Sequence, residues 1–287
     1  YFLGKADSIM SDDSSAKTYH FQPVAGIRHR MYADYAYYRF RDEAPDSAYN
    51  FLGINPFDSL QLKYFLNRIG NTFSLSGDLR IRGKLVQAEG GYGIEVERAL
   101  NGSYRNRFLN NFLFASLNKR ADASGEWLYR ASLQFYFSGN AIGNTHLAAQ
   151  AGRRLSGNGG EFRTGFDFSL QSPRYPQTQY ESNSFAFDQN LGKQTISKLY
   201  LQYENSYHHA LLEFNYYTLT NLIYFPTSTL QAWQYDAVVP LFQLRAQKEI
   251  QIRRFFLSND LLFQHISDNP AIRLPLLGGR HALSYRN

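Results

Sequence analysis

Histidine, serine and glutamate occur close together between residues 206 and 213, where metal binding or nucleophilic catalysis would first be sought. His208 and His209 are adjacent, so in a strand their side chains point to opposite faces, and in neither a strand nor a turn do they converge on one ion. Glu213 shares the parity of His209 but lies roughly 13 Å away, at about 3.3 Å per residue. Ser206 lacks the Gly-x-Ser-x-Gly turn that presents a nucleophilic serine. The sequence therefore predicts no catalytic residue, no metal ligand set, no cofactor and no enzymatic activity.

Three glycines form a second cluster to which chemistry could be assigned. Gly90, Gly91 and Gly93 lie within four positions, and glycine-rich turns bind phosphate where a helix follows them. No helical periodicity follows here. Within a strand such glycines mark a bulge or a bend, so we expect them to shape the wall of a sheet.

Charged and polar residues alternate with apolar ones from Thr72 to Leu85 without a break. Successive strand residues point to opposite faces, so this segment has one apolar face and one charged face. At about 3.3 Å per residue it reaches roughly 45 Å. A tilted strand needs only about 9 to 11 residues to cross a bilayer. The segment is thus predicted to be a membrane-spanning strand that extends past the lipid.

The same alternation recurs in 126–138, 161–171, 198–216 and 254–264. It predicts an all-β fold, a transmembrane antiparallel up-and-down β-barrel of the bacterial outer-membrane type with at least 13 strands. The predicted lumen-facing residues are Arg80, Arg82, Lys84, Glu89, Glu95, Glu97, Arg130, Arg163, Asp167, Lys198, Glu204, Glu213, Arg254 and Asp260. The predicted lipid-facing residues are Phe73, Leu75, Leu79, Ile81, Tyr129, Leu133, Phe135, Phe166, Phe168, Leu201, Leu212, Phe214, Phe255 and Phe263. The alternative is a soluble sandwich whose apolar parity faces a core, although sandwich strands are typically half as long.

The charged parity carries both signs in nearly equal number. A hairpin of 71–84 and 86–98 would place the basic residues from Arg80 to Lys84 opposite the acids from Glu89 to Glu97. A dry core would need every one of these charges paired, whereas a water-filled lumen tolerates them. The near balance predicts weak selectivity between anions and cations.

Composition agrees with a barrel and limits the alternatives. Aromatic residues make up 16% of the chain while the mean hydropathy is −0.44, as expected where half of each strand faces lipid and half faces water. There is no cysteine, which excludes disulfides and Cys-ligated zinc or iron–sulfur sites. The net charge is +6, but basic residues are interspersed with acids, so no nucleic-acid partner is predicted.

The expected strands are 18–29, 31–41, 60–68, 71–84, 86–98, 107–118, 126–138, 144–155, 161–171, 194–205, 208–219, 235–248 and 252–266, with a last one from about 282. Toward the C-terminus, short and long connections alternate, and the long ones are expected outside the cell because outer-membrane barrels have short periplasmic turns. Loop 42–59 is long but falls on the periplasmic side in this count, which indicates a miscounted strand or a plug-like insertion. The chain begins at Tyr1 and ends in an apparent new strand, so we expect residues 1–287 to be one barrel domain, incomplete at both ends.

Four stretches in the C-terminal 40% carry a family resemblance: Tyr180–Asn190, Tyr216–Phe225, Leu244–Ile250 and Gln264–Pro275. In their aromatic and polar pattern and their order, they resemble the putative porins of Bacteroidota outer membranes. The resemblance implies an outer-membrane β-barrel with a channel role and no catalytic motif.

The leading hypothesis is a porin-like barrel that gives passive or weakly selective passage to small hydrophilic solutes. The alternative is a structural or accessory barrel with a plugged lumen, which binds partner proteins of an outer-membrane secretion, uptake or surface-attachment complex. The expected partners are outer-membrane lipid and lipopolysaccharide, and in the alternative also other outer-membrane proteins.

Overall fold

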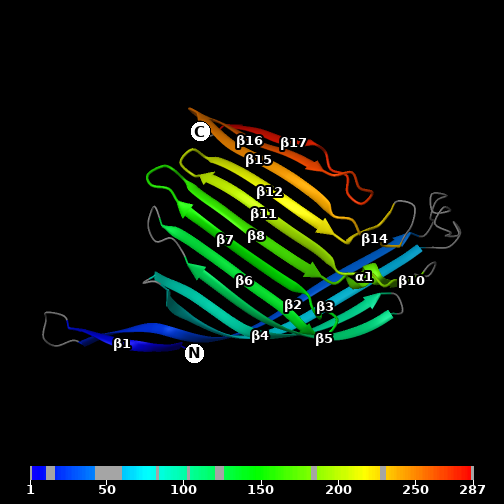
Figure 1. Ribbon diagram of the computed structural model, residues 1–287, viewed down its shortest axis with the longest axis horizontal. Coiled ribbons are helices and arrows are strands. Elements are labelled where there is room, and N and C mark those ends of the chain that lie inside the picture. Colours follow the sequence, from blue (N-terminus) through cyan, green and yellow to red (C-terminus); the bar gives the residue numbers. More distant parts are fainter. Residues whose placement is uncertain are drawn as a thin grey trace.

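The computed structural model describes residues 2–10, 17–42, 60–81, 84–101, 104–119, 126–181, 186–226 and 231–285. Its main element is one 13-stranded antiparallel sheet in up-and-down order, which confirms the predicted fold class (Figure 1). Across the sheet the strands are β1 (Phe2–Met10), β2 (Lys17–Asp42), β3 (Leu60–Ile81), β4 (Lys84–Asn101), β5 (Tyr104–Lys119), β6 (Trp127–Ser138), β7 (Thr145–Arg154), β8 (Glu161–Gln171), β11 (Gln194–Asn205), β12 (Ala210–Thr220), β15 (Val239–Ile252), β16 (Phe255–Ile266) and β17 (Leu277–Tyr285). Among the described residues the two edge strands, β1 and β17, do not pair with each other.

Small elements occupy two of the connections. The segment between β8 and β11 holds helix α1 (Tyr175–Thr178) and the two-stranded sheet of β9 (Gln179–Glu181) and β10 (Ala186–Asp188). The segment between β12 and β15 holds the sheet of β13 (Leu222–Tyr224) and β14 (Trp233–Tyr235). In the described part of the chain, no helix is long and apolar enough to cross a membrane.

Four of the expected strands form only two long strands in the structure. Segments 18–29 and 31–41 form the single strand β2 of 26 residues. Segment 60–68 and residues 71–81 of segment 71–84 belong to β3, of 22 residues. Ile69 and Gly70 were wrongly placed in a break between the predicted strands 60–68 and 71–84. In the sheet, Gly70 pairs directly with Tyr32, whose ring occupies the space where a side chain would be. Strand β1 was not predicted.

Merging these strands corrects the placement of the N-terminal loop. β2 ends at Asp42 and β3 begins at Leu60, at the same end of the sheet as the connections 172–193, 221–238 and 267–276 (Figure 1). Residues 43–59, and with them the plug-like insertion proposed for 42–59, lie outside the described residues. The opposite end carries short connections, such as 155–160 and 206–209. All connections of ten or more residues in the 13-stranded sheet thus lie at one end, together with the shorter connections 102–103 and 139–144.

The hairpin of β3 and β4 reverses earlier in the chain than predicted. Ile81 pairs with Lys84 and Arg80 with Leu85, so the chain reverses between Ile81 and Lys84 and not at Leu85, between the predicted strands 71–84 and 86–98. By register, Lys84 therefore shares a face with Ile81, and its prediction alongside Arg80 was wrong. Arg82 lies outside the described residues, and the side chains of Arg80, Ile81 and Lys84 are not described.

The apolar face of the sheet is open to its surroundings. The side chains of Leu75, Leu133 and Leu261 are 66%, 44% and 44% exposed, and described residues form no second layer over them. Exposure of so much apolar area to water would cost about 25 cal/mol per Å², whereas hydrocarbon accepts it without that cost. A soluble sandwich would bury this face, so that alternative is wrong.

The polar face is concave. Asp34 on β2 and Gln171 at the end of β8 line one cavity, although five strands separate β2 from β8 in the sheet order. Arg28 on β2 and Ser132 on β6 line a second one. The sheet therefore curls about its charged side, which we call the inner face; the apolar side is the outer face.

Candidate functional site: the inner face

A buried carboxylate is the centre of the inner face. Glu95 on β4 is only 4% exposed, and it accepts a hydrogen bond from the hydroxyl of Tyr32 on β2 and one of 3.1 Å from the hydroxyl of Tyr136 on β6. Gly70, the β3 residue between them, pairs with both Tyr32 and Glu95 and has no side chain to separate them. Burying a charged group is costly unless it is hydrogen-bonded, so these two hydroxyls hold Glu95 in place.

Two ion pairs flank Glu95 along the same strand. Arg68 on β3 lies 3.3 Å from Glu97. Arg28 on β2 lies 3.2 Å from Glu89, which also accepts a 2.7 Å hydrogen bond from the hydroxyl of Ser74. Alternation on β2, β3, β4 and β6 thus brings residues distant in sequence into one polar network. We call it the tyrosine–carboxylate cluster: Arg28, Tyr32, Arg68, Glu89, Glu95, Glu97 and Tyr136.

Aromatic rings occupy the space beside glycines of the neighbouring strand. A Cβ added to Gly93 would lie 2.1 Å from Cζ of Phe112, its direct partner on β5. The same arrangement joins these further pairs: Tyr32 and Gly70, Phe114 and Gly91, Tyr200 and Gly165. The structure has no bulge at Gly90–Gly93, because the register with β3 and β5 runs through these residues without a shift. The glycines instead make room for rings on the inner face.

The connection after β8 folds back onto the inner face. Tyr175 of α1 is 7% exposed and its ring lies 6.1 Å from that of Phe108 on β5. The amide of Asn106 donates hydrogen bonds to the Tyr175 hydroxyl and, at 3.3 Å, to the side chain of Gln179. The amide of Asn101, at the end of β4, donates to the backbone carbonyl of Gln179. We call residues 174–181 the folded-in segment.

A cavity of about 640 Å³ lies between the folded-in segment and the tyrosine–carboxylate cluster. Its lining includes Glu95, Glu97, Arg68 and Tyr136 from the wall, with Arg174 and Tyr175 from the segment. Side chains of both signs and hydroxyl groups line it together, so it offers hydrogen-bonding partners to hydrated solutes. No group of His, Asp or Glu that could hold a metal ion occurs in the described residues.

The second half of the inner wall carries further charge pairs. Arg245 on β15 makes two hydrogen bonds with Asp260 on β16, at 2.9 and 2.7 Å. The ammonium of Lys198 on β11 lies 3.9 Å from Glu213 and 5.1 Å from the ring centre of Tyr200. Opposite charges therefore alternate along this wall and cancel locally.

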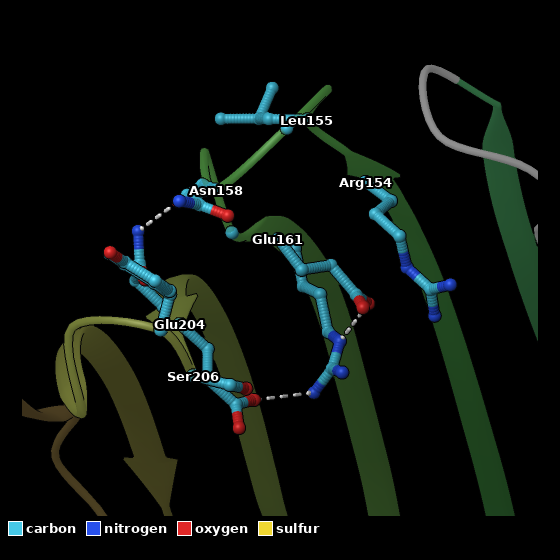
Figure 2. A pocket seen from close by; sticks show the side chains of 11 residues that line it. Arg154, Leu155, Asn158, Glu161, Glu204 and Ser206 are labelled. Carbon is cyan, nitrogen blue, oxygen red and sulfur yellow. Dashed lines mark hydrogen bonds and ion pairs between the residues drawn. The ribbon is translucent and has the colours of Figure 1, made fainter.

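At the short-turn end, Arg163 bridges two carboxylates that would otherwise repel. Glu161 on β8 and Glu204 on β11 are direct partners in the register, and Figure 2 shows both at the same pocket. Arg163 lies 2.5 Å from Glu161 and 3.4 Å from Glu204. The amide of Asn205 donates a 2.8 Å hydrogen bond to the carbonyl of Asn158, which ties the two turns together (Figure 2). The charges of Glu161 and Glu204 at the surrounding cavity of about 310 Å³ are thus compensated by arginine.

Most of the predicted inward residues share the inner face. By register these are Glu89, Glu95, Glu97, Arg130, Arg163, Asp167, Lys198, Glu204, Glu213 and Asp260. Arg254 does not: it lies in the turn between β15 and β16 and donates a 3.3 Å hydrogen bond to the Tyr285 hydroxyl. The predicted strand began too early at 252, whereas Arg253, with φ of 58°, already turns the chain.

The predicted lipid-facing residues share the outer face. Ten have exposed side chains: Phe73, Leu75, Leu79, Tyr129, Leu133, Phe135, Leu201, Leu212, Phe255 and Phe263. Phe166, Phe168 and Phe214 are half-buried among their neighbours on that face. That these residues contact lipid, and that those of the inner face contact water, stays a prediction.

Sequence reasoning missed four members of the tyrosine–carboxylate cluster: Arg28, Tyr32, Arg68 and Tyr136. A usable signal existed for Arg68, because the even-numbered polar parity of 72–80 continues back through Gly70 to Arg68. The assumed break at Gly70 concealed it.

An up-and-down antiparallel sheet with an apolar outer face and a charged concave face defines an outer-membrane β-barrel protein. The whole chain, residues 1–287, matches the family described as "Putative porin", and the protein therefore belongs to that family of the bacterial outer membrane. No curated protein sequence matches it.

Solved structures support the same architecture. The chain is similar to the copper transporter OprC (TM-score 0.59, 11% identity, 91% of this chain and 48% of that one). It is also similar to a mutant of the ferric enterobactin receptor PfeA from Pseudomonas aeruginosa in complex with enterobactin (TM-score 0.58, 12% identity, 84% of this chain and 44% of that one). A third similar structure is that of the siderophore receptor PirA from the same organism (TM-score 0.52, 13% identity, 88% of this chain and 53% of that one). The chain thus spans about half the length of these structures, and at such identities the likeness concerns the fold alone.

Proposed function

We propose that the protein belongs to a barrel that gives small hydrophilic solutes weakly selective passage across the outer membrane, along the inner face. The observation that carries this proposal is the inner wall itself, where carboxylates, arginines and tyrosine hydroxyls gather on a concave surface around a cavity of about 640 Å³. Charged groups are tolerated there at low cost if water fills the space. Because the charges form pairs of opposite sign, neither anions nor cations gain a strong advantage.

The folded-in segment sets the width of this passage in our proposal. Tyr175 and Gln179 are anchored to β4 and β5 by hydrogen bonds, so the segment takes space from the inner side. The same observation favours the alternative, a plugged accessory barrel that binds other outer-membrane proteins. Conductance separates the two, since a plugged barrel passes no current.

The test is the reversal potential of the complete protein in a planar bilayer under a KCl gradient. For the wild type we expect clear channels with a reversal potential near zero. Arg68→Gln leaves the charge of Glu97 uncompensated and should shift the reversal potential toward the equilibrium potential of K⁺. Glu97→Gln should shift it toward the equilibrium potential of Cl⁻. The double variant should return near the wild-type value.

Lys248→Gln is the control, because Lys248 lies on the outer face opposite Ala210 and should leave the potential unchanged. A purified, folded protein without channels would contradict passage. Channels whose selectivity ignores both cluster variants would show that solutes do not pass this wall.

A further inference from the structure

Five basic residues share the outer face at the long-loop end of β2 to β5. Arg39, Lys63, Arg98, Arg105 and Arg107 all have exposed side chains, and their parity is that of the exposed apolar residues Tyr37, Ile69 and Leu109 on the same strands. We call them the outer basic patch.

The patch contains like charges in direct contact positions. Arg39 is the register partner of Lys63, and Arg98 that of Arg107. Like charges directly opposite each other destabilise a sheet. Within the described side chains of the 13-stranded sheet, every carboxylate lies on the inner parity, from Asp34 on β2 to Asp260 on β16. The described side chains of the sheet therefore offer this patch no counter-charge, whereas Arg68, Arg163 and Arg245 on the inner wall pair with carboxylates.

The patch also lies at a defined height above the apolar band. Ile69, Val96 and Leu109 form one row across β3, β4 and β5, and Arg98 and Arg107 stand two residues beyond it. From Ile81 to Ile69 the strand advances about 40 Å at about 3.3 Å per residue, or roughly 30 Å along the membrane normal at a tilt of about 40°. The hydrocarbon-contacting band of such barrels is about 25 Å tall.

The cations therefore begin where hydrocarbon ends. Tyr35 pairs through Asn67 with the row of Arg98 and is 81% exposed, which is typical of the aromatic girdle at a membrane interface. With the long loops outside the cell, this height corresponds to the headgroups of the outer leaflet.

We propose that the outer basic patch binds the phosphate groups of the glycolipid of the outer leaflet, lipopolysaccharide. Guanidinium groups bind phosphate oxygens in a bidentate manner, and a phosphate between Arg98 and Arg107 relieves their mutual repulsion. Basic residues near an anionic leaflet each add to lipid affinity. The patch thus fixes one sector of the protein, β2 to β5, to phosphorylated lipid.

The test is native mass spectrometry of the complete, detergent-purified protein titrated with diphosphoryl lipid A and with chemically dephosphorylated lipid A. The wild type should bind the diphosphoryl form at least about tenfold more tightly. The variant Arg98→Gln/Arg105→Gln/Arg107→Gln should lose most of that difference, and the corresponding triple lysine variant should keep a large part of it. High salt should weaken the wild-type preference, because exposed charges are screened.

The matched control is Arg30→Gln/Arg130→Gln/Arg280→Gln, which removes the same charge from the inner parity and should keep the tenfold preference. Equal binding of both lipids by the wild type would overturn the proposal without relying on any variant. An undiminished preference in the folded glutamine variant at the patch would overturn it as well.

Discussion

Replacing residues 174–188 by a short Gly-Ser turn should raise the single-channel conductance of the complete protein several-fold. The replacement removes Tyr175 and Gln179, which Asn106 and Asn101 hold against the inner face. β8 and β11 remain joined, since Gln171 and Gln194 are already direct partners in the register. Current through a pore is limited by its narrowest cross-section, so clearing the segment from the wall widens the limiting part.

A shortened connection between β12 and β15 is the control for this experiment. The segment with β13 and β14 makes its hydrogen bonds to Asn221 and to residues 189–193, away from the tyrosine–carboxylate cluster. Its removal should leave the conductance within the wild-type spread. If the 174–188 replacement folds and conducts like the wild type, the folded-in segment does not narrow the passage.

Gly93→Ala should lower the free energy of unfolding by about 1–3 kcal/mol, the usual cost of overpacking. The new methyl group would lie 2.1 Å from the Phe112 ring, and Phe112 is only 4% exposed. The centre of the Phe112 ring also lies 5.0 Å from that of Tyr136. The Phe112 ring therefore cannot move without disturbing Tyr136, which donates a hydrogen bond to Glu95. Urea unfolding of the complete protein in lipid vesicles, followed by tryptophan fluorescence, measures the difference.

The same strand offers a matched control. Gly90 has the opposite parity, and a Cβ there would meet its nearest neighbour, the carbonyl oxygen of Phe114, at 3.9 Å. Gly90→Ala should therefore be neutral within about 0.5 kcal/mol or slightly stabilising. A double variant Gly93→Ala/Phe112→Ala should show a favourable coupling between the two sites. Equal effects of the two glycine substitutions would refute the proposed seating of Phe112.

The alternation of polar and apolar residues predicted the features that depend on single strands. The all-β fold and the common face of residues such as Glu95 and Asp260 follow from the two-residue period of extended chain, which holds wherever a strand is continuous. It failed where local composition contradicted the strand. Gly70 looked like a break because its role, making room for Tyr32, is supplied by a residue on another strand.

Features that need contacts distant in sequence could not be predicted. Tyr32 and Glu95 are 63 positions apart, and Asn106 and Tyr175 are 69 apart. Nothing local in 174–181 indicates that it folds onto β5. The outer basic patch was missed for a related reason: along the sequence the basic residues are interspersed with acids, and only the register places Arg98 opposite Arg107.

The central claim is that the apolar face touches hydrocarbon and the charged face touches water, and single-cysteine labelling along β6 tests it most directly. The described chain contains no cysteine, and Tyr129, Leu133 and Phe135 alternate there with Arg130, Ser132 and Gln134. A fluorophore at each position of the reconstituted complete protein would be quenched either by nitroxide-labelled lipid or by a water-soluble nickel chelate. We expect lipid quenching at 129, 133 and 135 and aqueous quenching at 130, 132 and 134. Aqueous quenching at the apolar positions, or no alternation at all, would contradict the account.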